Sequence, residues 1–112
     1  MKILLYILLF SLIINSDFKN VQVLEIKSGK EMKKYMKSIS RDLGAKCKDC
    51  HNMDDKSLDN PVKDKAREMM ILTRQINDFL ASVNKTEDKK IEKVTCWTCH
   101  KGSFEVEHKR EE

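Results

Sequence analysis

The sequence predicts a small, mainly α-helical protein with little or no sheet, built from two similar units. Its 112 residues allow one domain at most. Two segments carry apolar residues at helical spacing, and each is followed by a pentapeptide of the form C-x-x-C-H, at Cys47–His51 and at Cys96–His100. The pentapeptides use all four cysteines and two of the three histidines. Each unit is therefore an amphipathic helix followed by C-x-x-C-H.

The N-terminus differs in composition from the rest of the chain. Lys2 precedes an apolar run over residues 3–14 that only Ser11 interrupts. The run is shorter than the roughly 20 residues that a membrane-spanning helix needs. We therefore expect residues 1–16 to be a signal peptide cleaved near Ser16, with retention as a short membrane anchor as the alternative. Residues 17–112 would form the mature domain, which we expect in the periplasm.

The first helix is predicted between Ser28 and Gly44. Ser28 and Glu31 form the S-x-x-E pattern of a capping box, and Gly44 suits a helix C-cap. Lysines and Arg41 occupy the face opposite the apolar one. The apolar face carries Met32, Tyr35, Met36, Ile39 and Leu43. The helix is thus expected to end just ahead of the first pentapeptide.

The second helix is predicted to begin at Asn60-Pro61, with Asn as the cap and Pro at the first helical position. Its apolar face gives about five or six turns. The members of this face are Val62, Ala66, Met69, Met70, Thr73, Ile76 and Leu80. A charged loop over residues 84–93 then leads to Val94 and the second pentapeptide, and Lys101-Gly102 is expected to end the short helix there.

The form C-x-x-C-H has a chemical reason. Two thiols three residues apart can each add to one vinyl group of a single haem, and the next histidine binds its iron. The predicted attachment residues are Cys47, Cys50, Cys96 and Cys99, and the predicted iron ligands are His51 and His100. Two covalently attached c-type haems are therefore expected. Disulfides are the plain alternative for an exported chain, but they have no use for the adjoining histidines. Zinc binding and a redox dithiol are the other readings.

Charge gives little support for nucleic acid as a partner. The formal net charge is +4, and the mature segment, without Lys2, has 21 basic against 18 acidic residues, or +3. Four haem propionates would bring this to −1. The lysines are scattered among acidic residues, as on a solvated surface. A chain this short makes a marginal core, which two haems would complete.

The sixth position on each iron separates the functional classes. A methionine or a second histidine closes the iron for electron transfer, whereas an open site permits gas binding or peroxide chemistry. With three histidines, two bis-histidine haems are impossible, and His108 in its charged tail is expected on the solvated surface. Methionine is the remaining donor. Spacing alone does not choose between Met32 and Met36, or between Met69 and Met70.

A wider pattern spans the two units and consists of the runs Asn20–Leu24, Met36, Leu43-Gly44, Cys47–His51, Ala66–Met69, Ile76-Asn77 and Val94–Gly102. These runs resemble the cytochrome c subunit of photosynthetic reaction centres, and are similar to one two-haem half of that four-haem subunit. The resemblance covers nearly all of the mature chain. It implies that Met36 binds the first iron opposite His51, and that Met69 binds the second opposite His100. Met32 and Met70 would then be packing residues.

Together these features lead us to expect an exported dihaem cytochrome that passes single electrons between redox proteins and catalyses no reaction. Its partners would be an electron donor and an electron acceptor, with membrane association only through an uncleaved N-terminus. The alternative is a small dihaem peroxidase or a gas-sensing cytochrome, in which one haem lacks its methionine.

Overall fold

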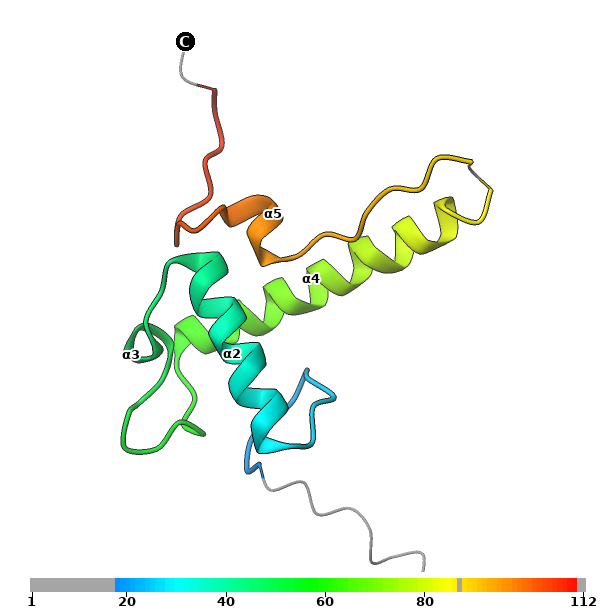
Figure 1. The fold of residues 1–112 in the computed structure, drawn as a ribbon. Helices are drawn as coiled ribbons and strands as arrows, with labels where there is room; N and C mark the ends of the chain where they lie inside the picture. The colour runs from blue at the N-terminus through cyan, green and yellow to red at the C-terminus, as the bar shows by residue number, and fades with distance from the viewer. Residues whose placement is uncertain (1–17, 87, 111–112) are drawn as a thin grey trace, which may run out of the picture.

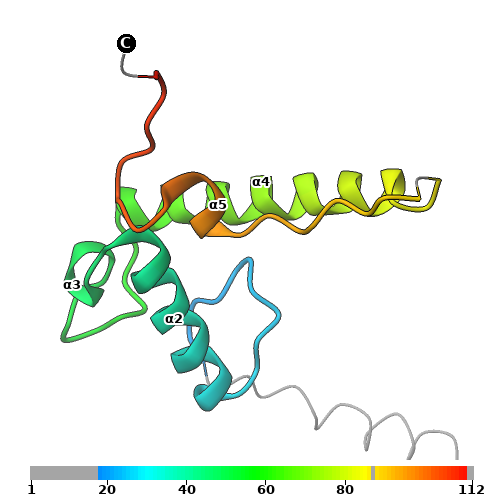
Figure 2. The same ribbon diagram turned by 45° about the horizontal axis from the view of Figure 1, so that its top comes forward.

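The computed structural model describes residues 18–86 and 88–110, and within these residues the chain is helical without any strand. The helices are α2 (Gly29–Leu43), α3 (Cys47–Cys50), α4 (Pro61–Val83) and α5 (Cys96–His100). Figures 1 and 2 show α2 at an angle to the long helix α4, near its first half, and the segment after α4 running back along that helix. No helix in the described part of the chain has the length and apolar character needed to cross a bilayer. The expected signal peptide lies outside the described residues.

Helix α2 begins and ends where its capping residues predict. The Ser28 hydroxyl accepts a hydrogen bond from the Glu31 N–H at 3.2 Å. At the other end Gly44 adopts the left-handed conformation with φ of 60°, and the Ala45 N–H donates to the Ser40 carbonyl at 3.1 Å. The predicted boundaries of this helix are confirmed.

Helix α4 begins at Pro61 and ends at Val83, as the cap and the length of the apolar pattern predict. The Asn60 side chain accepts a hydrogen bond from the Lys63 N–H at 2.9 Å. The half-buried side of the helix includes Ala66, Met70 and Asn77. Next to this side runs an exposed apolar stripe that consists of Val62, Met69, Leu72, Ile76 and Phe79.

The segment after α4 lies along the helix instead of forming a free loop. Asn77 of α4 and Asn84, the C-cap of that helix, each exchange two side-chain hydrogen bonds of 2.8–2.9 Å with the backbone of one residue, Val94 and Ile91 respectively. Seven helical residues span about 10.5 Å, and three extended residues span about 10 Å. The two pairs are therefore in register, and α4 positions the chain just ahead of α5.

The two sequence units interlock. Helix α2 of the first unit packs against α5 of the second, and α4 of the second unit packs against α3 of the first. Each long helix therefore contacts the pentapeptide of the other unit. The Gly102 N–H donates to the Asp42 carbonyl at 2.9 Å, and a Cβ on Gly44 would overlap the carbonyl oxygen of Gly102. Both glycines have positive φ. Only residues without a side chain allow this approach of α2 and α5.

The described polypeptide forms almost no core of its own. Ala45, which is 7% exposed, is the one buried residue in the described part of the chain. Large apolar side chains such as Phe79 (66% exposed) and Trp97 (49%) remain open. A polypeptide that leaves this much apolar surface uncovered is typical of one that folds around a large apolar group or a partner.

Candidate haem-attachment sites

The four cysteines lie on the two one-turn helices. Cys47 and Cys50 begin and end α3, while Cys96 begins α5 and Cys99 precedes its last residue. Side chains three residues apart on a helix lie on the same side, so each pair presents two thiols together. All four thiols are free.

Burial raises the pKa of one thiol at each site, Cys50 at the first and Cys96 at the second. Nearby carboxylates, Asp49 and Asp42 respectively, add to the shift because they disfavour a second negative charge. At both positions the surroundings therefore disfavour the thiolate. Within residues 18–86 and 88–110, no three side chains of His, Cys, Asp or Glu come together as a metal cluster.

The residue before the second cysteine stabilises each turn. The Asp49 carboxylate accepts a hydrogen bond from the Lys46 N–H at 2.7 Å. In the same position of the second site, the Thr98 hydroxyl accepts from the Thr95 N–H at 2.9 Å. These side chains satisfy backbone donors that a helix start leaves free. They prearrange the thiol pairs, a role that the C-x-x-C-H pattern alone does not reveal.

Both histidines are oriented in the same way. The Nδ1 atom of His51 lies 3.0 Å from the carbonyl oxygen of Lys56, and that of His100 lies 3.0 Å from the carbonyl oxygen of Ser103. Because a carbonyl only accepts, Nδ1 must carry the proton, which leaves the lone pair on Nε2. Within the described residues no hydrogen bond engages either Nε2. Histidines that bind metals are typically held in this manner, so the residues fit a haem iron.

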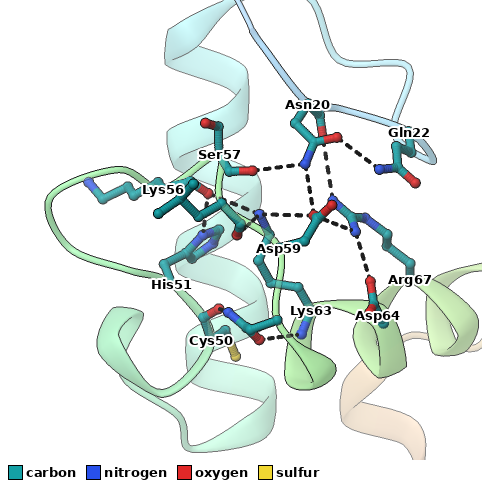
Figure 3. A network of polar contacts seen from close by, with 12 residues as sticks. Asn20, Gln22, Cys50, His51, Lys56, Ser57, Asp59, Lys63, Asp64 and Arg67 are labelled. Carbon is teal, nitrogen blue, oxygen red and sulfur yellow. Dashed lines mark hydrogen bonds and ion pairs between the residues drawn. The ribbon is translucent and has the colours of Figure 1, made fainter.

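The first turn of α4 holds the loop that follows His51 (Figure 3). The Lys63 ammonium donates to the carbonyls of Lys56 and Leu58, at 3.1 and 2.7 Å. The Asn60 amide donates to the carbonyl of Cys50 at 2.8 Å. The loop carbonyl that orients His51 is therefore fixed by a side chain of α4.

A polar network extends this attachment to the N-terminal segment (Figure 3). The Asn20 amide donates to the Ser57 carbonyl and to the Asp59 carboxylate, both at 2.8 Å. Arg67 forms an ion pair with Asp59 at 2.9 Å, and its hydrogen bond holds the pKa of that carboxyl below the ordinary value. The network thus joins residue 20, the loop after α3 and helix α4.

The second site is held by one side chain of α4 and by the close approach of two backbone segments. Asn77 fixes Val94, and the close approach of Gly44 and Gly102 joins the end of α5 to α2. A Cβ on Gly102 would lie 3.1 Å from the Trp97 ring, so the indole lies over this glycine. In the described part of the chain, the Ser103 carbonyl accepts no side-chain hydrogen bond other than that of His100.

The four candidate methionine ligands lie on the two long helices, as the sequence predicts. On α2, Met32 and Met36 are both half-buried. On α4, Met69 is 42% exposed in the apolar stripe, whereas Met70 is half-buried on the covered side. His108 is exposed in the C-terminal tail, which extends away from the helices in both views (Figures 1 and 2).

Comparison with known proteins agrees with this geometry. The family model of the photosynthetic reaction centre cytochrome c subunit matches residues 13–108. Searches of curated proteins and of solved structures found no match. The matching family consists of multihaem c-type cytochromes, electron carriers that bind their haems covalently and exchange electrons with redox partners. The helical fold without strands in the described residues and the match over most of the sequence lead to one conclusion. This chain belongs to the family of photosynthetic reaction centre cytochrome c subunits.

Proposed function

We propose that this protein is a dihaem cytochrome c that passes single electrons between two redox proteins. The observation that carries the proposal is the repetition of one complete arrangement. At both sites a pair of free thiols shares one helical turn, and the adjoining imidazole donates from Nδ1 to a backbone carbonyl. Two such arrangements support one haem at each site.

The residues that would hold the haems follow from this arrangement. Cys47 and Cys50 would attach the first haem, and Cys96 and Cys99 the second, with His51 and His100 as iron ligands. A bound haem supplies reversible one-electron chemistry. The polypeptide orients the imidazoles, excludes water and sets the potential, and no catalytic residue is needed.

We further propose methionine as the second ligand of each iron, Met36 at the first site and Met69 at the second. The exposure of Met69, within an apolar stripe that the polypeptide leaves uncovered, supports the second assignment. The family resemblance supports both. Methionine ligation gives a comparatively high reduction potential and leaves no open position for a gas or a peroxide.

We also propose that residues 1–16 direct export and that residues 17–112 act in the periplasm. The cysteine chemistry supports this placement, since paired free thiols next to histidines suit covalent haem attachment after export. Sequencing the N-terminus of the purified protein tests the cleavage near Ser16.

The function is tested on protein produced in a host that attaches c-type haems in the periplasm. The reduced protein is exposed to carbon monoxide, and the ferric protein is scanned in the near infrared. We expect reversible reduction, a methionine–iron charge-transfer band and no carbon monoxide binding. Carbon monoxide binding by the unmodified protein would instead support the peroxidase or gas-sensor class.

A further inference from the structure

We infer that Lys63 raises the reduction potential of the haem at the first site, acting through the carbonyl group of Lys56. The inference rests on the proposed function, in which each C-x-x-C-H site carries a haem. Lys63 forms no hydrogen bond with the predicted ligand His51 or with the cysteines; its hydrogen bonds go to the carbonyls of Lys56 and Leu58. It is a positioning residue that shares a hydrogen-bond acceptor with the histidine.

The shared acceptor is the carbonyl oxygen of Lys56. It lies 3.0 Å from Nδ1 of His51 and 3.1 Å from the ammonium nitrogen of Lys63 (Figure 3). A carbonyl oxygen has two lone pairs, so it can accept both hydrogen bonds. At the second site, His100 donates to the Ser103 carbonyl, which accepts from no cation among the described residues. The two sites therefore differ in one cation: an ammonium group donates to the carbonyl that accepts from His51, and none donates to the carbonyl that accepts from His100 among the described residues.

Solvent and ions screen the positive charge of Lys63 only weakly. Its side chain is only 11% exposed, and buried charges are screened less than surface charges. The only carboxylate within 4 Å, among the described residues, is that of Asp59 at 3.8 Å, which is beyond hydrogen-bond distance. That carboxylate forms its closer contact with Arg67, at 2.9 Å. The two hydrogen bonds of Lys63 instead go to the carbonyls of Lys56 and Leu58.

The effect on an iron bound to His51 has a definite sign. A cation on the carbonyl draws electron density from it, so the carbonyl becomes a weaker acceptor for the Nδ1 proton. The imidazole then donates less electron density through Nε2, and the ferric state is stabilised less. The positive charge itself also disfavours the more positive ferric iron. Both effects raise the reduction potential of the first haem relative to a site without the cation.

The test is a spectroelectrochemical titration of the holoprotein with both haems attached. The titration of the dihaem protein is expected to contain two one-electron components, one for each haem. A variant with Cys47→Ser and Cys50→Ser, which retains only the second haem, first shows which component belongs to which site. In Lys63→Met we expect the first component to shift to lower potential while the second stays in place. The expected change is about tenfold in the ferric-to-ferrous ratio, which is about 59 mV for a one-electron couple. Lys63→Arg keeps the cation and should stay near the wild-type potential.

The matched control is Lys65→Met on the same helix. Lys65 is 67% exposed and pairs with Glu68. The Lys65→Met substitution therefore removes the same charge without removing a hydrogen bond to the Lys56 carbonyl. An unshifted first component in Lys63→Met, or an equal shift in Lys65→Met, would overturn the inference. Lys63→Gln provides a second neutral variant. If both neutral variants lose the first haem while Lys63→Arg keeps it, Lys63 only holds the loop, and the inference is wrong.

Failure of the proposed function would be visible before any variant is made. In that case the wild-type protein would lack two covalently attached haems and would show no pair of one-electron components.

Discussion

The two C-x-x-C-H sites share one local geometry but are held by different parts of the molecule. At the first site, side chains from the start of α4 hold the attachment turn and the loop after it: Asn60 donates to the carbonyl of Cys50, and Lys63 donates to two carbonyls of the loop after His51. At the second, the backbone approach of Gly44 and Gly102 holds the helix that ends at His100. The pentapeptide thus determines the thiol pair and the imidazole. The surrounding segments determine the charge and packing around them.

The difference follows from chain connectivity. The first pentapeptide is followed by a loop that must return to α4, so polar side chains can bridge it (Figure 3). The second is followed by the C-terminal tail, which extends away from the helices (Figure 1). Its support must therefore come from the preceding segment and from α2. The first site is accordingly the more polar of the two.

The largest expected effect comes from replacing the proposed methionine ligands, because each replacement would leave one iron with an open coordination position. Met36→Ala should leave both haems attached and give high-spin character and carbon monoxide binding at the first site only. Met69→Ala should do the same at the second site. Absorption spectra of the ferric and the carbon monoxide-treated ferrous proteins measure this. Met32→Ala and Met70→Ala are the matched controls, and a spectrum that changes in the controls instead would move the ligand assignment to the neighbouring methionine.

The next effect concerns the backbone contact that supports the second site. Gly44→Ala would force a side chain into a left-handed conformation and against the Gly102 carbonyl. We expect a loss of about 3 kcal/mol in the free energy of unfolding. Gly29→Ala is the control, since no atom lies within 4 Å of its Cβ position. Chemical denaturation of the holoproteins compares them, and equal stability of the two variants would contradict the contact.

A smaller effect is expected from Asn77 of α4, whose side chain holds the backbone of Val94 just ahead of α5. Asn77→Ala leaves the half-buried N–H and carbonyl of Val94 without their partners, at a cost of roughly 2 kcal/mol. Asn84→Ala removes the same pair of hydrogen bonds from Ile91, which is 51% exposed and can bond to water instead. Asn77→Ala should therefore destabilise the protein more in thermal unfolding. The opposite order would show that the segment is not held at Val94.

The smallest effect is the pH dependence of the network at the first site. The hydrogen bond from Arg67 lowers the pKa of Asp59 in the folded state, so the unfolded chain binds the proton more readily. The stabilisation is therefore present above the ordinary carboxyl pKa and is lost as pH falls through the lower folded value. Asp59→Asn should be less stable than wild type near neutral pH, and the difference should vanish in acid.

Acid titration followed by circular dichroism measures this convergence, with the exposed residue Asp88 changed to Asn as the control. A constant difference between wild type and Asp59→Asn across the acid range would mean that ionisation of this carboxyl does not stabilise the fold.

Local rules in the sequence predict much of the fold. Ser28, Gly44 and Asn60 act as caps because capping depends only on a few neighbouring residues, and the boundaries of α2 and α4 follow from them. The pairing of thiols with a histidine is likewise written in five consecutive residues. Both the helical fold and the family were therefore accessible from the sequence.

Contacts between distant segments could not be predicted in this way. Lys63 and the carbonyl of Lys56 meet because the loop between them turns back onto α4, and no residue pattern marks a backbone carbonyl as a partner. The meeting of Gly44 with Gly102 depends on how α2 and α5 pack. Asn84 looked like the start of a loop, although it pairs with Ile91. The methionine ligands stay predictions, and so does the signal peptide.

The most direct test of the central claim is the intact mass of the purified, exported protein, with a thiol count on the same sample. We predict the mass of the chain cleaved near Ser16 plus two haems, and no free thiol at Cys47, Cys50, Cys96 or Cys99. A chain that carries one haem or none, with free thiols or disulfides at either pair, would contradict the proposal that both sites bind a haem.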